Sequence, residues 1–163
     1  MTSGHFYPQS LDGMWKAGDL VIDGVVTELT PADEQVPGQP PITLTATSYH
    51  LIVIEAFKTD SRWNPKERAF TVTRMGGVRD QGDHILKRFD PRFPSFEKGE
   101  RYILFLTHLR RTEYAPLGPD GAYQVSSAGI KARGGAAFAK HLGTLSFNDI
   151  RLTLLRLGFP KTH

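Results

Sequence analysis

The chain has 163 residues, of which 39% are hydrophobic and 23% are charged, and this balance predicts a single folded domain rather than a disordered chain. Its 20 Lys and Arg residues against 17 Asp and Glu residues give a net charge of only +3, a weak excess for a nucleic-acid-binding protein. The absence of Cys excludes disulfide frameworks, thiolate metal sites and cysteine nucleophiles.

The first half of the chain predicts three strands. Residues 19–29 are mostly apolar and β-branched around Gly24, which indicates a strand with a bulge or bend at the glycine. Residues 30–41 contain four prolines, so we expect a surface loop that cannot donate to a sheet. A long strand over 43–57 and an alternating strand over 68–74 follow, with a turn between them.

The next part of the chain predicts a strand buried on both sides and a hairpin. After a polar stretch with a short strand over 84–89, residues 100–109 alternate apolar side chains on both faces. The sequence Gly-Pro-Asp-Gly at 118–121 is typical of a tight turn, so we expect 113–117 and 122–127 to form a hairpin.

The end of the chain predicts helices. A helix is expected from Ser146, which forms a capping pair with Asp149, to Gly158, and a shorter one over 136–142. The longer helix carries Leu152 and Leu155 outside its main apolar stripe. This wider apolar surface is covered either by the barrel and a loop, which we favour, or by a partner chain.

These elements predict a mainly β fold, a small and partly closed Greek-key barrel with a C-terminal helix. We expect an N-terminal extension over 1–18, a barrel domain over 19–130 and a helical segment over 131–163 that packs on the barrel. Irregular segments are expected at 1–18, 30–41 and 78–98. Because these segments contain many Pro and aromatic residues, we expect them to become ordered against a partner.

The order of the predicted strands resembles a known family. The stretches AGDLVIDGVVTEL, YHLIVIEAFKT, TVTRMGG, PSFEKGERYILFL and YAPLGPDGAYQV, within residues 17–127, are similar to bacterial netrin-like and tissue-inhibitor-of-metalloproteinase-like domains. The resemblance implies a barrel of the oligonucleotide/oligosaccharide-binding (OB) type and an extracytoplasmic location, periplasmic or secreted. The inhibitors of this family chelate zinc with an N-terminal Cys, so their mechanism does not carry over to a chain without Cys.

Residue patterns that support catalysis or metal binding are missing from the sequence. Its six His residues show no HxH, HxxxH or HExxH spacing, and Asp80, Asp83 and His84 fit a polar turn better than a calcium loop. The sequence contains neither a GxSxG element nor a phosphate-binding loop. Asp23 and Glu55 could act as acid and base only if the fold brings them together. We therefore predict no catalytic residue, no cofactor and no metal.

No apolar run is long enough for a membrane helix, and the start of the chain lacks the pattern of a signal peptide. We therefore expect no membrane span.

Basic and aromatic residues interleave around the third predicted strand, as they do in barrels that bind single-stranded nucleic acid. Phe70 alternates with Val72 and fits a core position, while Trp63 beside Asn64 and Pro65 fits the cap of a loop. The candidate residues for a partner or ligand are Trp15, Arg62, Trp63, Arg68, Arg74 and Arg79.

The sequence thus favours a non-enzymatic protein-binding module, an accessory subunit or inhibitor-like domain of a larger assembly. The alternative is binding of single-stranded nucleic acid or polysaccharide on the barrel face. A hydrolase with dispersed carboxylates is a third class.

Overall fold

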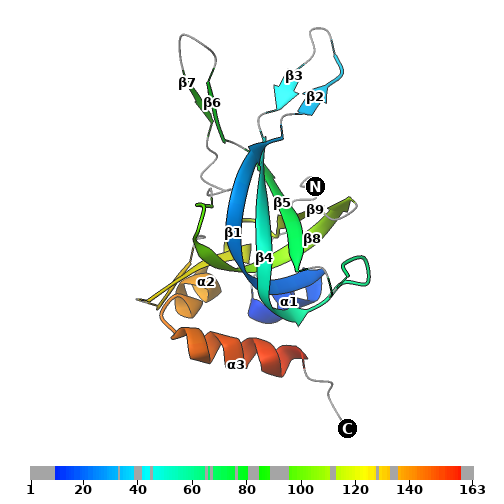
Figure 1. Cartoon of the computed structure of the whole chain (residues 1–163). Helices are drawn as coiled ribbons and strands as arrows, with labels where there is room; N and C mark the ends of the chain where they lie inside the picture. The colour runs from blue at the N-terminus through cyan, green and yellow to red at the C-terminus, as the bar shows by residue number, and fades with distance from the viewer. Residues whose placement is uncertain are drawn as a thin grey trace, which may run out of the picture.

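The computed structural model describes residues 10–158, apart from 33, 39–41, 45, 65, 67, 76, 81–84, 89–95, 111–112, 128 and 133–135. Strands dominate this part of the chain, and three helices flank them (Figure 1). The elements are α1 (Leu11–Ala17), β1 (Leu20–Pro31), β2 (Glu34–Val36), β3 (Ile42–Leu44), β4 (Ala46–Lys58), β5 (Ala69–Met75), β6 (Gly77–Asp80), β7 (Ile85–Arg88), β8 (Arg101–Arg110), β9 (Glu113–Pro116), the 3-10 turn η1 (Pro119–Gly121), β10 (Ala122–Ser126), β11 (Gly129–Ala132), α2 (Ala137–Leu142) and α3 (Phe147–Gly158).

Five strands form a closed barrel in the order β1, β4, β5, β9 and β8. The ring closes because β1 pairs with β4 along one edge and with β8 along the other. Neighbours in the ring are antiparallel except β5 and β9, which run parallel. The predicted mainly β barrel is confirmed, and the pairing of β1 with β8 makes its closure complete.

Bulges in the β1–β4 pair allow these two long strands to bend around the barrel. The register between β1 and β4 shifts at three places, one of them between Asp23 and Gly24. A Cβ atom at Gly24 would lie 3.1 Å from the carbonyl oxygen of Ile52, a tight contact that a larger residue could make only if the neighbouring backbone shifted slightly. The irregularity predicted at Gly24 is confirmed, and its extra residue is Ile54 on β4.

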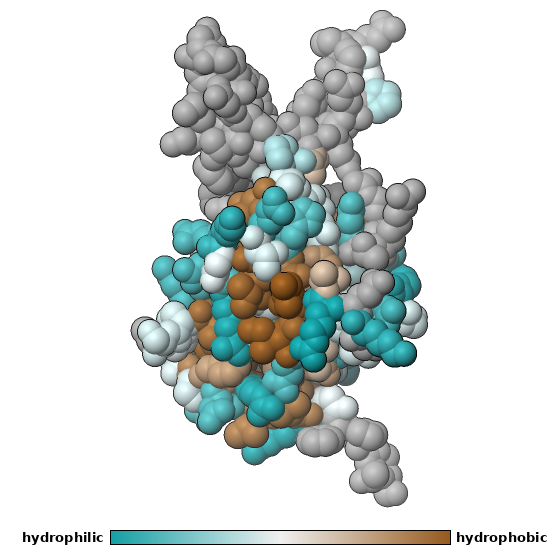
Figure 2. Space-filling model, viewed as in Figure 1, coloured by the Kyte–Doolittle hydropathy of each residue, from teal (hydrophilic) through white to brown (hydrophobic). Residues whose placement is uncertain are grey.

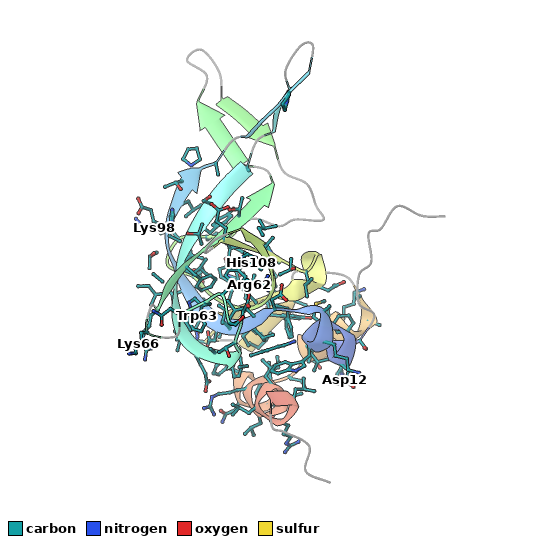
Figure 3. The ribbon with its side chains drawn as sticks, turned by 90° about the vertical axis from the view of Figure 1, so that its right-hand side faces the viewer. Asp12, Arg62, Trp63, Lys66, Lys98 and His108 are labelled. Atoms are coloured by element: carbon teal, nitrogen blue, oxygen red, sulfur yellow. The ribbon has the colours of Figure 1, made fainter. Side chains whose placement is uncertain are left out.

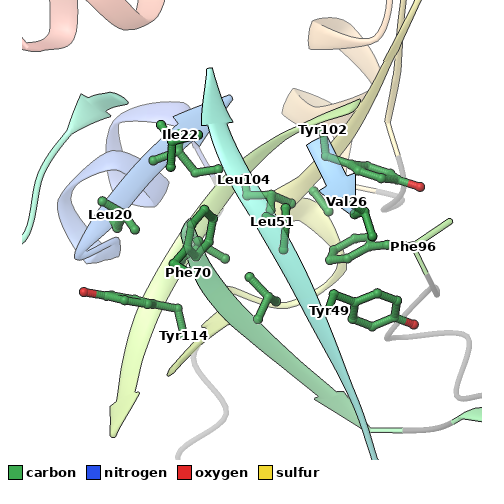
Figure 4. Packing of buried hydrophobic residues seen from close by; sticks show 14 of the residues in the cluster. Leu20, Ile22, Val26, Tyr49, Leu51, Phe70, Phe96, Tyr102, Leu104 and Tyr114 are labelled. Carbon is green, nitrogen blue, oxygen red and sulfur yellow. The ribbon is translucent and has the colours of Figure 1, made fainter. Parts of the chain in front are cut away.

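The inside of the barrel is a core of apolar and aromatic side chains (Figure 4). Phe96 seals it with aromatic contacts, since its ring centroid lies 4.6 Å from that of Tyr102 and 5.1 Å from that of Tyr49. This inner core consists of Leu20, Ile22, Val26, Tyr49, Leu51, Val53, Trp63, Phe70, Val72, Phe96, Tyr102, Leu104, Leu106, Tyr114 and Ala122.

An outer core lies between the barrel and the three helices. Ile103 and Phe105 of β8 face the helices while the residues between them face the barrel interior, so β8 is buried on both sides as predicted. Helix α3 begins after Ser146, whose Oγ accepts a hydrogen bond from the Asp149 N–H at 3.1 Å. The predicted helix and its cap are confirmed, as is the shorter helix α2. None of the described helices is long and apolar enough to cross a membrane.

The hairpin predicted between β9 and β10 is wrong. Both strands pair with β8 along the same edge, β9 with its second half and β10 with its first half. The turn at 118–121 therefore separates two strands that run in the same direction along β8, and it does not reverse the chain. The hairpin in this region joins β10 to β11, and Gly129 adopts a φ of 125° after the turn.

Three segments expected to be irregular contain regular structure. Residues 11–17 form α1, which Ser10 caps by accepting a hydrogen bond from the Gly13 N–H. Its Met14 is fully buried in the outer core. In 30–41, β2 pairs with β3, since the four prolines fall outside residues 34–36. In 78–98, β6 pairs with β7, which confirms the short strand predicted there. Both two-stranded ribbons project from the same end of the barrel (Figure 1).

Candidate functional site

The outer face of β4 and β5 carries an exposed apolar patch, which we define as Val25, Ile52, Ile54 and Ala69. Ile52 is 47% exposed and Ile54 is 43% exposed, and they stand two residues apart on the same side of β4. Val25 and Ala69 are the register partners of Ile52 on its two neighbouring strands. Figure 2 shows the hydrophobic side chains gathered at the centre of this face, over β1 and β4.

Hydrogen-bonded polar side chains border the apolar patch towards the two ribbons. The imidazole of His50 lies between two threonines, with its Nε2 3.0 Å from Thr30 Oγ1 and its Nδ1 3.4 Å from Thr71 Oγ1. Thr27 Oγ1 donates to the His50 carbonyl at 3.0 Å. The border is therefore formed by side chains that hydrogen-bond to one another, and the exposed Glu28 is the register partner of His50 on β1.

A pocket of about 180 Å³ borders the apolar patch at its other end. Its walls combine apolar atoms with the guanidinium group of Arg68, which has no ion-pair partner among the described residues. The lining residues are Val53, Ile54, Glu55, Ala56, Thr59, Trp63 and Arg68.

A tight turn that begins at Asp60 directs the segment after β4 back under the barrel. The Trp63 N–H donates to the Asp60 carbonyl at 3.0 Å, and the Arg62 N–H donates to Asp60 Oδ1 at 3.2 Å. Asp is a preferred first residue of such turns because its carboxylate can bind a backbone N–H two residues later. The turn inserts the Trp63 side chain into the inner core, where Trp63 is 5% exposed.

Arg62 links this turn to the strands behind it (Figure 3). Its Nε donates to both Asp60 oxygens, at 3.0 and 2.9 Å, and its Nη2 lies 3.5 Å from Asp19 Oδ1. Its Nη1 lies 3.2 Å from His108 Nδ1. Because a guanidinium group can only donate, this contact requires His108 Nδ1 to be unprotonated. Arg62 is thus engaged on three sides and anchors the turn.

Two pKa shifts follow from this network. Burial by itself would raise the pKa of Asp60, but hydrogen bonds from Arg62 and Tyr114 outweigh it and hold the pKa below 3.8. The Tyr114 hydroxyl donates to Asp60 Oδ2 at 3.2 Å, and burial together with the Asp60 charge raises the pKa of Tyr114 to about 12. Asp60 is therefore a carboxylate and Tyr114 a neutral phenol at neutral pH, and both hold structure together.

The structure brings three of the six candidate binding residues together. Arg62, Trp63 and Arg68 lie in the segment between β4 and β5. Only Arg68 stands exposed with no charged partner among the described residues, since Arg62 is bound by Asp60 and Trp63 is almost fully buried. The Trp63 ring therefore offers no exposed surface on which a base or a sugar could stack.

The other three candidate residues lie elsewhere. Trp15 is half-buried against the outer core, and its carbonyl accepts a hydrogen bond from Lys58 Nζ at 2.7 Å. Arg74 lies near the end of β5 and Arg79 lies in β6, both towards the end of the barrel that carries the ribbons. Their side chains are outside the described part of the structure. The six residues therefore do not form one basic and aromatic surface.

Asp23 and Glu55 do meet across β1 and β4, as register partners. Each carboxylate is held by a different arginine: Arg101 Nε donates to Asp23 at 2.8 Å, and Arg151 donates to both oxygens of Glu55 at 2.7 and 3.0 Å. Such forked pairs fix both carboxylates in place. The Asp23–Arg101 pair joins β1 to β8 within the barrel, and the Glu55–Arg151 pair joins β4 to α3.

The sequence interpretation missed the apolar patch. Leu51, Ile52, Val53 and Ile54 form an unbroken apolar run, which is typical of a strand buried on both sides. In the structure only Leu51 and Val53 are buried. The signal was present in the run itself, but only the tertiary structure shows that no described element covers its outer side.

The fold and this face define the chain as a closed five-stranded β-barrel with a helical layer and an exposed apolar patch. The described residues contain no group of three or more His, Asp or Glu that could hold a metal ion. No family model and no curated protein sequence matches the chain.

Proposed function

We propose that this chain is a non-enzymatic protein-binding module, an accessory or inhibitor-like subunit of a larger assembly, and that it contacts its partner through the β4–β5 face. The observation that carries the proposal is the apolar patch, because large side chains exposed side by side on a sheet are typical of interaction surfaces. The exposed Glu28 beside His50 at the border of the patch fits a protein partner better than a polyanion.

The barrel architecture supports the same face. OB-type barrels are five-stranded Greek-key barrels that bind ligands on the face of their second and third strands. In chain order the second and third strands of this ring are β4 and β5. The ring is thus compatible with the resemblance to netrin-like and tissue-inhibitor-of-metalloproteinase-like domains.

The alternative of nucleic-acid or polysaccharide binding draws little support from this face. Such binding uses exposed aromatic side chains as stacking platforms. The aromatic residues Tyr49 and Phe70 of β4 and β5 point into the barrel and are each 3% exposed. What remains outside on these two strands is mainly isoleucine, threonine and alanine.

The test compares Ile52→Arg with Leu109→Arg, a matched control because the two side chains are 47% and 50% exposed and lie on different strands. Tagged protein is recovered from nuclease-treated extracts of its source cells, and the stoichiometry of any bound protein is measured by mass spectrometry. We expect a partner in fixed ratio whose affinity falls about tenfold or more with Ile52→Arg, since burying one large aliphatic side chain contributes about 1.5–3 kcal/mol.

Leu109→Arg should leave the affinity unchanged. Equal binding by both variants, or no protein partner after nuclease treatment, would contradict the proposal. Tight binding of a fluorescent single-stranded oligonucleotide that weakens steeply with salt would favour the alternative instead.

A further inference from the structure

Strand β4 extends beyond its neighbour β5. The last register pair of these two strands is Ile52 with Ala69, and the Val53 N–H then donates to the Arg68 carbonyl at 2.7 Å. From there to Lys58, β4 has β1 on one side, and no strand of the described chain lies on the other. An edge of this kind exposes backbone groups that can pair with another chain.

The pocket beside the apolar patch lies at this free edge. Val53, Ile54, Glu55 and Ala56 of β4 form one wall, and Trp63 and Arg68 come from the returning segment. The register between β1 and β4 shifts at this point, so that Ile54 has no partner on β1. A bulge of this kind redirects a side chain, and here Ile54 lines the pocket.

Trp63 forms part of the pocket wall from its position in the inner core. Its indole Nε1 is buried and has no hydrogen-bond partner among the described residues. This N–H is closed to a ligand, so Trp63 contributes the apolar part of its ring to the pocket.

The charge of the pocket lining determines whether an acidic or a basic ligand group is favoured there. Glu55 is neutralised by Arg151, whose Nε lies 2.7 Å from Glu55 Oε1. Arg68 is exposed and has no ion-pair partner among the described residues. The unneutralised charge in the pocket lining is therefore positive, and it favours an acidic group.

We propose that an extended segment of the partner protein pairs with the free edge of β4 after Val53 and places an apolar side chain in the pocket and an acidic side chain against Arg68. Addition of a strand to a sheet edge is a common mode of peptide recognition, in which backbone hydrogen bonds give affinity and pockets give specificity. The inference rests on the proposed protein-binding function and specifies the part of the partner that binds at this site.

The test selects binders of the full chain from a phage-displayed library of random heptapeptides. We expect the enriched peptides to combine an acidic residue with apolar residues at alternate positions, and to protect backbone amides in β4 after Val53 from hydrogen exchange. Binding of the synthetic peptides should weaken tenfold or more in Arg68→Glu. Lys140→Glu, an equal charge change at an exposed site on α2, should leave binding unchanged.

Selection that enriches no peptide, peptides that bind Arg68→Glu as well as the wild-type chain, or protection confined to other elements would overturn the inference. These results are separable from a failure of the proposed function because Ile52 does not line the pocket. Loss of the partner in Ile52→Arg together with an unchanged affinity in Arg68→Glu would retain the protein-binding face and reject the added strand.

Discussion

Asp60 determines the conformation of the segment between β4 and β5. Its carboxylate accepts hydrogen bonds from the backbone and guanidinium of Arg62 and from the hydroxyl of Tyr114, and its carbonyl accepts from Trp63. A buried carboxylate is tolerated only when it is paired in this way. One side chain therefore couples a surface turn to the position of the buried Trp63 and, through it, to the pocket.

Replacing Asp60 with Asn should destabilise the chain. The amide keeps one acceptor for the turn but loses the charge that binds Arg62, so we expect a loss of about 1–3 kcal/mol in the free energy of unfolding. Urea denaturation at about neutral pH measures this loss. Asp12→Asn, at an exposed site on α1, is the control and should cost less than about 0.5 kcal/mol.

The effect of Asp60→Asn should depend on pH. Because the folded chain holds the pKa of Asp60 below 3.8, the carboxylate stabilises the fold above that pH, and this contribution is lost as the pH falls through the folded pKa. The difference in unfolding free energy between wild type and variant should therefore shrink as the pH falls below 3.8. A difference that stays constant in acid would contradict the role given to this charge.

At the scale of elements, α3 joins the barrel by two kinds of contact. Ile150 and Leu154 are buried in the outer core. Arg151 forms a forked ion pair with Glu55 of β4 at the edge of the same contact. Burial of apolar side chains contributes more to stability than a partly exposed ion pair, so the helix should depend mainly on its apolar stripe.

Two substitutions in α3 separate these contributions. Leu154→Ala should cost about 2–5 kcal/mol because Leu154 is 1% exposed and its removal leaves a cavity. Arg151→Met should destabilise the chain less than Leu154→Ala because the ion pair remains partly open to water. Denaturant unfolding of both variants measures the order, and a larger loss for Arg151→Met would show that the ion pair, not the core, fixes the helix.

At the scale of the whole molecule, two strands belong to both cores. Leu104 of β8 faces the barrel while Phe105 faces the helices, and Ile22 and Val21 of β1 divide in the same way. Loss of either core would expose one face of these shared strands. The barrel and the helical layer should therefore unfold as one unit.

The two tryptophans report on this cooperativity, because Trp63 lies in the inner core and Trp15 packs against the outer one. In Trp15→Phe and in Trp63→Phe, the remaining tryptophan should lose its native fluorescence at the same denaturant concentration at which the circular dichroism of the backbone changes. A fluorescence midpoint that precedes the circular-dichroism midpoint in either variant would show that one layer unfolds first.

Local sequence signals predicted most of the features that depend on residues close together in the chain. The bulge at Gly24, the two-sided burial of 100–109 and the cap at Ser146 each depend on residues close together in the chain. The hairpin at 118–121 failed because a turn sequence does not determine which strand its flanks will pair with. The helix at 11–17 was missed because seven residues are too few to show a helical periodicity, and the buried Met14 stabilises it.

The six residues predicted to bind a partner do not gather at one place. Arg68 and Trp63 both line the pocket, whereas Arg74 and Arg79 lie towards the other end of the barrel. A run such as that of residues 51–54 has the same appearance whether its outer face is covered or open. The exposure of Ile52 and Ile54 was therefore not readable from the chain.

The alternation of apolar residues, the glycines and the capping residues were enough to determine a mainly β barrel with a helix at its end, because these signals act over a few residues. Ring closure by β1 and β8, the free edge of β4 and the uncovered apolar patch arise only when distant segments meet. Which faces a sheet buries depends on the number and length of the elements that reach it, and that is a property of the assembled fold.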